Sequence, residues 1–474
     1  MDKKRIFPIL LILFLTTPLA LEVIFNCSSV AQENNLNLIC DKIHIVRHSY
    51  YNTKFMDATT FKSYNGNATV VIVGARSSAV YCYSYNAYQD ITYEFIRWNR
   101  AEEIKLAPEA IDTLGDRGFA IVAGGYIRNN NTDVFIQSFD PDLFPEWRVT
   151  WGSEKVNETV IDIASNVENV FILGTANYEN RTEAFILKYE IAPQLPVETI
   201  VLSKVFNFTI SEYSILKAMD VDNAGNVYIV GIYDIHGSSF VIKVDSKTGA
   251  IVFNRTLYKF NEDILMNDIA VYDGISLVIG SERTDGEDAN VSIWALDETG
   301  NTITHLEWEY GNNTEEVATS VTFDNYGIAY ITGYVIDPNE AETSNIELTR
   351  DVIFISYDTN SWQVIKSDVV DKLSDRLEIT DDVATAISVD SGNGIVFITG
   401  TSRDLMPSAA SIYFGFIIVY ATDNNKNNIG DYRESVPTES EPLQFHFNLV
   451  DILCILVSIV SISIAVFVLI KKKC

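Results

Sequence analysis

A short apolar segment that ends in glycine recurs seven times along the chain, and this repeat limits the possible folds more than any other feature. The segments are rich in β-branched and aromatic residues, as at 69–74 and 396–400, which is typical of buried strands. Successive glycines lie 50, 50, 57, 49, 53 and 67 residues apart, and they are Gly74, Gly124, Gly174, Gly231, Gly280, Gly333 and Gly400. This spacing is close to the roughly 40–50 residues of a four-stranded propeller blade.

Each glycine segment has the same kinds of neighbours. A strand that ends in an Asn-, Asp- and Gly-containing turn precedes it, as at 218–226 and 319–327. A third strand that ends in or near an acidic residue follows, as at 240–245, and a more variable fourth strand comes next, as at 146–151. We therefore predict an all-β fold over residues 40–423, a seven-bladed β-propeller of four-stranded antiparallel blades.

The seventh unit supplies only three strands, the last of them at 416–420. The apolar, alternating segment at 42–47 lies just after the N-terminal apolar stretch and can supply the missing fourth strand. Because a closed ring leaves few exposed sheet edges, we expect this N-terminal strand to join the last blade.

The units resemble the SBBP-type β-propeller repeat family, whose blades carry an Ala-rich strand, an Asp-x-x-Gly-Asn-x-Tyr turn and a Gly-Thr or Gly-Tyr exit. The match is best at 218–231, 317–333 and 383–401, whereas the first three units lack the turn sequence. The resemblance implies a propeller displayed at a cell surface and no defined reaction, since a fold hosts many functions.

Both ends of the chain carry membrane-directed patterns. Residues 1–31 combine basic residues, an apolar stretch and small residues before Gln32, which indicates a signal peptide, with an uncleaved anchor as the alternative. Residues 424–448 are polar and indicate a flexible stalk. Residues 449–470 are long and apolar enough for a transmembrane helix, and the lysines at 471–473 place the tail at 471–474 in the cytoplasm. We expect a single-pass protein of the cell membrane with most of the chain outside the cytoplasm.

Composition excludes one large class of partner. The formal net charge is −30, from 64 acidic and 34 Lys and Arg residues, and no basic stripe is present, so nucleic acid is not an expected partner. Five cysteines are present, and three of them fall in the end segments. Cys40 and Cys82 remain for the ectodomain, and we expect them to form one disulfide in an oxidising compartment.

The order of strands also predicts which loops share a face. If strands run from the inside to the outside of each blade, the second-to-third loops and the connections between blades lie on one face, opposite the stalk. Eight glycosylation sequons occur. Six of them map to this face, Asn130, Asn157, Asn180, Asn207, Asn290 and Asn312, and the other two are Asn67 and Asn254. Two long acidic loops of the sixth unit, at 334–350 and 371–382, are candidate binding loops through Asp337, Glu340, Glu342, Glu347, Asp375, Glu378, Asp381 and Asp382.

Catalytic and metal motifs are not evident. The five histidines have no acidic or Cys ligand set, no nucleophile elbow or phosphate loop occurs, and residues 220–226 lack the full ligand set of a calcium loop. We expect no cofactor, with calcium as the weak exception. The favoured hypothesis is a non-enzymatic module that binds protein or glycan partners; the alternatives are an extracytoplasmic hydrolase or quinoprotein-like dehydrogenase and a structural envelope component.

Overall fold

A computed structural model of the chain describes 29 strands. The residues that it describes are 23–25, 39–46, 53–62, 68–76, 79–86, 91–96, 105–113, 119–128, 131–140, 144–179, 181–192, 199–209, 214–233, 237–260, 262–284, 288–311, 313–336, 349–370, 380–404 and 412–421. The chain divides into two units, Met1–Asn425 and Lys426–Cys474, and the second lies outside the described residues.

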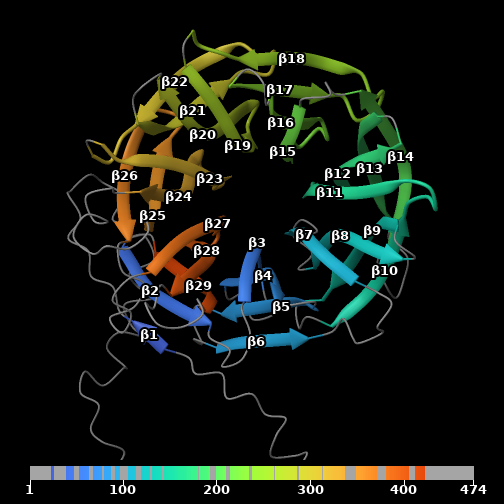
Figure 1. Cartoon of the computed structure of the whole chain (residues 1–474), viewed down its shortest axis with the longest axis horizontal. Helices are drawn as coiled ribbons and strands as arrows, with labels where there is room; N and C mark the ends of the chain where they lie inside the picture. The colour runs from blue at the N-terminus through green and yellow to red at the C-terminus, as the bar shows by residue number, and fades with distance from the viewer. Residues whose placement is uncertain are drawn as a thin grey trace, which may run out of the picture. The chain divides into compact units, whose positions relative to one another are not determined.

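Seven antiparallel sheets surround a central opening (Figure 1). Blade 1 contains β3 (Thr53–Lys62), β4 (Ala68–Arg76), β5 (Ala79–Asn86) and β6 (Ile91–Ile96), and blade 2 contains β7 (Lys105–Thr113), β8 (Ala120–Arg128), β9 (Asn131–Phe139) and β10 (Pro145–Trp151). Blade 3 contains β11 (Asn157–Ser165), β12 (Asn169–Tyr178), β13 (Arg181–Ala192) and β14 (Thr199–Thr209), and blade 4 contains β15 (Ser214–Val221), β16 (Val227–Tyr233), β17 (Ser238–Val244) and β18 (Ile251–Leu257).

The remaining blades repeat this order. Blade 5 contains β19 (Glu262–Tyr272), β20 (Ile275–Thr284), β21 (Ala289–Leu296) and β22 (Thr302–Trp308), and blade 6 contains β23 (Glu315–Phe323), β24 (Ile328–Ile336), β25 (Arg350–Asp358) and β26 (Gln363–Val370). Blade 7 contains β27 (Thr380–Asp390), β28 (Ile395–Asp404), β29 (Ile412–Ala421) and the N-terminal β2 (Ile39–Val46). The prediction of a seven-bladed, four-stranded propeller is confirmed.

The ring closes where the sequence predicts. Strand β2 pairs antiparallel with β29, from Ile39 opposite Ala421 to Val46 opposite Gly415. A short strand that the sequence analysis did not anticipate, β1 (Val23–Phe25), adds to the outer edge of β2, within the predicted signal segment. No helix in the described part of the chain has the length and apolar character that a membrane span requires. The predicted helix at 449–470 lies outside that part.

The core lies between neighbouring blades. The second and third strands of a blade are covered on both sides, so all residues of β17 are buried, whereas the outermost β10 alternates between exposed and half-buried residues. Apolar clusters join blades 1 and 2, 2 and 3, 3 and 4, 4 and 5, 5 and 6, and 6 and 7. At the seventh junction Tyr85 of blade 1 packs edge-on against Phe397 of blade 7, with ring centroids 6.5 Å apart. Each blade thus buries both of its faces against its neighbours.

The repeated glycine is explained by a β-bulge in the innermost strand. In all seven blades the glycine pairs with the residue just before an extra residue of that strand, as Gly333 pairs with Ala318 before the bulge at Thr319. A Cβ on Gly333 would lie 1.9 Å from the carbonyl oxygen of Val317, and one on Gly280 would lie 2.1 Å from that of Leu265. Only glycine allows the two backbones to approach so closely.

The strand order defines two faces of the ring. We call the face with the connections between blades and the second-to-third loops the top, and the face with the first-to-second and third-to-fourth turns the bottom. Turns of the bottom face use positive-φ glycines, such as Gly225 (φ 83°) and Gly300 (φ 83°). Asp222 caps one such turn by accepting hydrogen bonds from the backbone of Asn226 (2.7 Å) and, through its carbonyl, from Gly225 (2.9 Å). The calcium-loop-like segment at 220–226 is therefore a hairpin turn.

Candidate functional site

Five aspartates from the innermost strands of blades 1 to 5 surround the central channel. The first residue after the bulge is aspartate in blades 1, 3 and 5, namely Asp57, Asp162 and Asp268. The third residue after the bulge is aspartate in blades 2 and 4, namely Asp112 and Asp220. We call these two levels the first tier and the second tier. Serine and threonine occupy corresponding positions elsewhere: Ser320 in the first tier, and Thr59, Thr322 and Ser388 in the second.

Most of these carboxylates connect neighbouring blades by the same pair of hydrogen bonds. Asp162 accepts one from the backbone amide of Ile163 in its own strand (2.8 Å) and one from that of Met219 in the next blade (2.7 Å). Asp57, Asp220 and Asp268 repeat this pattern with Ile111, Val271 and Val321 of the following blades. A charged acceptor strengthens such a bond, so the aspartates hold the inner strands of adjacent blades together.

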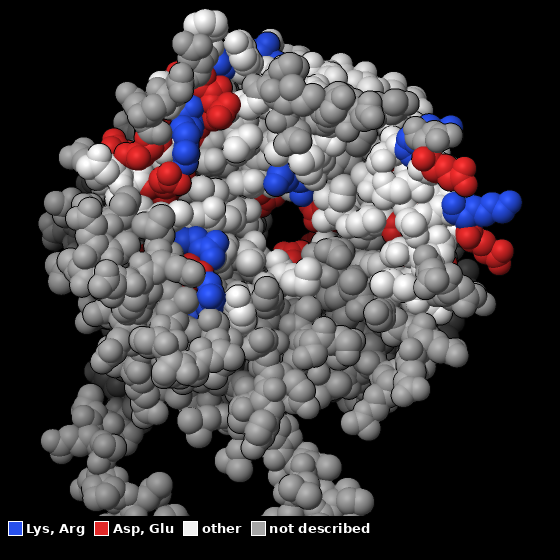
Figure 2. Space-filling view, viewed as in Figure 1, with Lys and Arg blue, Asp and Glu red and all other residues white. Residues whose placement is uncertain are grey.

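The channel contains a cavity of about 270 Å³ lined by both tiers. Figure 2 shows acidic atoms around the rim and wall of the central opening. Burial raises the pKa of Asp57 to about 6 and that of Asp112, Asp220 and Asp268 to about 7, and it raises the pKa of Asp162 well above its ordinary value. Repulsion from other channel carboxylates contributes to the raised pKa of Asp112, Asp162, Asp220 and Asp268.

These five residues were not predicted from the sequence, although the sequence contains a recurring pattern that marks four of them. Four of them lie 11 or 12 residues before the strand glycine: Asp112 before Gly124, Asp162 before Gly174, Asp220 before Gly231 and Asp268 before Gly280. Three of these four follow an apolar residue, and all four lie in segments with the composition of an ordinary strand. Aligning the repeats on their glycines would have exposed the recurring acid.

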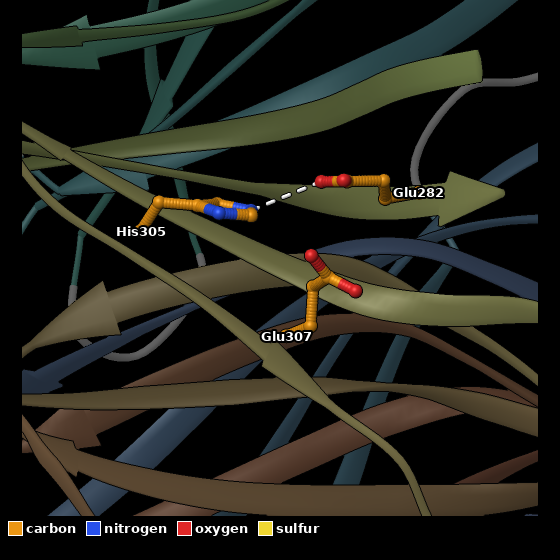
Figure 3. Close-up of side chains that lie close together, drawn as sticks. All are labelled: Glu282, His305 and Glu307. Atoms are coloured by element: carbon orange, nitrogen blue, oxygen red, sulfur yellow. Dashed lines mark ion pairs between the residues drawn. The ribbon is translucent and has the colours of Figure 1, made fainter. Parts of the chain in front are cut away.

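A second polar cluster lies near the top of blade 5 (Figure 3). Glu282 of β20 and His305 and Glu307 of β22 place potential ligand atoms within 4.8 Å of one another, which is compatible with a metal site. However, the Lys259 ammonium pairs with Glu282, and it lies 2.8 Å from Glu307 and 3.2 Å from Glu262. Because a protein cation already neutralises these carboxylates, the cluster is better suited to joining blades 4 and 5 than to binding a metal.

The same cluster does not have the geometry of a catalytic triad. The Ser292 hydroxyl donates to Glu282 (2.8 Å) and lies 3.0 Å from His305 Nε2. Glu282 also approaches His305 at Nε2, at 3.0 Å, whereas a triad needs the acid and the nucleophile on different ring nitrogens. Ser292 is completely buried, so no substrate can reach it.

The predicted binding loops are described only at one end. Asp381 is buried in β27 and forms two hydrogen bonds with the Arg350 guanidinium (2.6 and 2.7 Å), and Asp382 is buried and accepts from the Thr380 (2.8 Å) and Ser402 hydroxyls. Both hold strands together and do not present a carboxylate at the surface. The other six candidates lie outside the described residues and remain predictions: Asp337, Glu340, Glu342, Glu347, Asp375 and Glu378.

Three of the sequon asparagines, Asn157, Asn207 and Asn254, are exposed on β11, β14 and β18, and Asn290 is half-buried at the start of β21. The other four lie outside the described residues, and glycosylation stays a prediction for all eight. Cys40 lies in β2 of blade 7 and Cys82 in β5 of blade 1, but their side chains are not among those described. Their predicted disulfide therefore also stays a prediction.

Exposed aromatic side chains occur on the top of blades 4 to 6. Tyr258 (57% exposed) and Phe260 (78%) belong to the connection from blade 4 to blade 5, and Tyr310 (53%) belongs to that from blade 5 to blade 6. The ion pair between Lys259 and Glu307 ties these two regions together. We call Tyr258, Phe260 and Tyr310 the aromatic patch. Figure 2 shows positive and negative side chains close together over the region of β22.

Comparison with known proteins provides little beyond the architecture. No protein-family model and no curated protein sequence matches the chain, so the resemblance to SBBP-type repeats stays a prediction. Among solved structures, oligogalacturonate lyase from Vibrio parahaemolyticus is similar at 9% identity over 83% of this chain and 98% of that one, with a TM-score of 0.44. A chain of a humanized mutant Polycomb Repressive Complex 2 from Chaetomium thermophilum matches at 8% identity over 83% and 98%, with a TM-score of 0.42. Such likenesses carry no functional information.

Proposed function

We propose that the chain is a membrane-anchored, extracytoplasmic β-propeller that binds protein or glycan partners through its top face and catalyses no reaction. The observation that carries this proposal is the aromatic patch. Tyrosine and phenylalanine side chains that are more than half exposed cost free energy in water, and aromatic residues are enriched at binding interfaces. Their position beside the Lys259 ion pairs provides apolar and polar contacts together.

The bottom face does not offer the same combination. Among the described residues of the bottom, the most exposed apolar side chains are Tyr326 (73%) and Val167 (63%), which lie in separate hairpin turns of blades 6 and 3. Single exposed apolar residues are ordinary on protein surfaces, whereas a group with adjoining charges is characteristic of a binding site. The predicted stalk also leaves from this side, because β29 runs toward the bottom and ends at Ala421.

A propeller enzyme is the second candidate, since the channel gathers ionisable groups as such an enzyme requires. The hydrogen bonds of the channel carboxylates argue against a catalytic role. Asp57, Asp162, Asp220 and Asp268 each accept two backbone amides, one of them from the next blade. A general acid or base must be free to exchange its proton with substrate, and a carboxylate held in this way is better suited to a structural role.

The binding proposal is tested with two matched double variants of the full chain. Phe260→Ser with Tyr310→Ser removes most of the aromatic patch, and Tyr326→Ser with Val167→Ser removes an equal number of exposed apolar side chains from the bottom. Partners are captured from intact cells by the wild-type protein, identified, purified and titrated against each variant; glycan candidates are screened on an array.

We expect the top variant to weaken binding by about 10-fold or more, because exposed aromatic anchors commonly contribute more than 1 kcal/mol each. The bottom variant should bind as the wild type does. Equal affinity of the two variants for every purified partner would contradict the proposal. If the wild type self-associates and both variants still do so, the alternative that the protein is a structural envelope component would be favoured.

A further inference from the structure

The lining of the channel cavity contains acids without bases among the described residues, although Figure 2 shows Lys or Arg atoms at the rim of the central opening. Five aspartates line the cavity, and no Lys, Arg or His occurs among the described residues that line it. Two buried acids elsewhere in the ring have a basic partner, Asp381 with Arg350 and Glu282 with Lys259. Two others, Glu158 and Glu316, accept hydrogen bonds from amide or hydroxyl groups instead. Gathering like charges around one cavity costs free energy unless a cation or protons neutralise them.

Two hydroxyl groups provide an independent indication of a ligand. Thr59 and Ser388 lie in the second tier of blades 1 and 7, line the cavity, and are only 9% and 6% exposed. Neither side chain has a hydrogen-bond partner among the described residues, and both line the cavity, so each hydroxyl is free to bind a ligand there. They complete the second tier on the side where aspartates are absent, so oxygen atoms from blades 1, 2, 4 and 7 surround the axis.

The spacing of these groups determines the kind of cation. Within the described residues, only Glu282, His305 and Glu307 bring three potential ligand atoms within 4.8 Å, so no three channel aspartates do so. A bare ion therefore cannot contact three of them at once. A cation that keeps part of its water shell fits a cavity of about 270 Å³ and can reach the carboxylates and hydroxyls through its bound waters.

We propose that the central channel binds one partly hydrated hard divalent cation, preferably Ca²⁺, between the aspartates of the two tiers and the hydroxyls of Thr59 and Ser388. Oxygen ligands favour such ions over softer metals. Calcium accepts six to eight ligands in flexible geometry, which suits a ring whose groups come from several blades. The channel aspartates keep their negative charge when they accept the hydrogen bonds between blades. The ion neutralises this charge and thereby stabilises the closed ring.

The test uses the full chain, freed of metal with EDTA and then titrated with CaCl₂ alone or MgCl₂ alone by calorimetry at pH 7.5 and pH 5. We expect one site per chain, with a dissociation constant of about 10⁻⁴–10⁻³ M, the range of extracellular calcium modules. Binding should be about 10-fold weaker at pH 5 and should release protons at pH 7.5, because burial raises the pKa of Asp112 and Asp220 to about 7.

Three variants locate the ion. Asp220→Asn keeps the shape of a channel residue and removes its charge, and Ser388→Ala removes one hydroxyl without disturbing a carboxylate. Glu168→Gln removes the same charge from an exposed turn and serves as the control. The first two should weaken Ca²⁺ binding by about 10-fold and 3-fold, and the control should not; Ser388→Ala remains informative if Asp220→Asn fails to fold.

Two results would overturn the proposal. One is the absence of a stoichiometric site, with calcium bound no better than expected for an acidic surface. The other is a site that His305→Ala abolishes while Asp220→Asn and Ser388→Ala leave it intact, because the ion would then lie in the blade 5 cluster.

Discussion

At the level of single residues, the strand glycine has a steric role that the composition of the strands does not reveal. Gly333 has an ordinary strand conformation, and so a turn or a positive φ does not explain it. It is required because the bulged inner strand brings the Val317 carbonyl oxygen to 1.9 Å from the place of a Cβ. The recurring glycine thus allows the bulge, and the bulge in turn sets the level at which the next side chain enters the channel.

Replacing Gly333 with alanine should therefore destabilise the protein strongly. Inserting a methyl group against a fixed backbone costs about 1–3 kcal/mol, because the inner strand must shift. Gly311 is the matched control, since a Cβ there would meet its nearest atoms only at 3.7 Å. Gly311→Ala should change the free energy of unfolding by less than about 0.5 kcal/mol in denaturant titrations. Comparable losses in the two variants would show that the close approach is not what selects glycine.

At the scale of strands, the sequence predicted the repeat well, because buried second and third strands have a composition that propensity detects. It also predicted the closing strand, since β29 would otherwise leave an open edge. The channel aspartates could not be recognised in this way. An Ile-Asp pair such as Ile161-Asp162 looks like an alternating strand, and only the bulge directs Asp162 toward Met219 of the next blade.

Pairing of β2 with β29 predicts that a crosslink there will stabilise the whole ring. Ile45 lies opposite Phe416, so cysteines at both positions would close a loop of about 370 residues. A loop of that length gives about 6 kcal/mol in the chain-entropy model, before any strain of the native state. Oxidation should raise the melting temperature of the double cysteine variant, relative to its form reduced with dithiothreitol, by more than it does for the wild type. The wild type is the control because its predicted Cys40–Cys82 disulfide is reduced as well. An oxidised form that melts no higher would argue against ring closure by β2.

For the molecule as a whole, lowering the pH from 8 to 5 should increase the free energy of unfolding. The folded pKa values of Asp57, Asp112, Asp220 and Asp268, about 6 to 7, exceed the roughly 3.9 of an unfolded aspartate. Burial likewise raises the pKa of Glu158 and Glu316 to about 7. The folded state therefore binds more protons than the unfolded state near pH 5. Stability from these groups is complete below about pH 4 and decreases as pH rises through 6 to 7.

We expect the melting temperature of the full chain in EDTA to rise by at least a few degrees between pH 8 and pH 5. Self-repulsion of a chain with a net charge of −30 also decreases in this range, so the titration is repeated in 1 M salt, where the Debye length falls to about 3 Å and exposed charges are screened. The contribution of the enclosed channel should persist in salt and should shrink when saturating Ca²⁺ replaces EDTA, because the ion then takes the place of the protons. A melting temperature that is constant or falls on acidification in 1 M salt would show that the channel carboxylates are not neutralised in the folded protein.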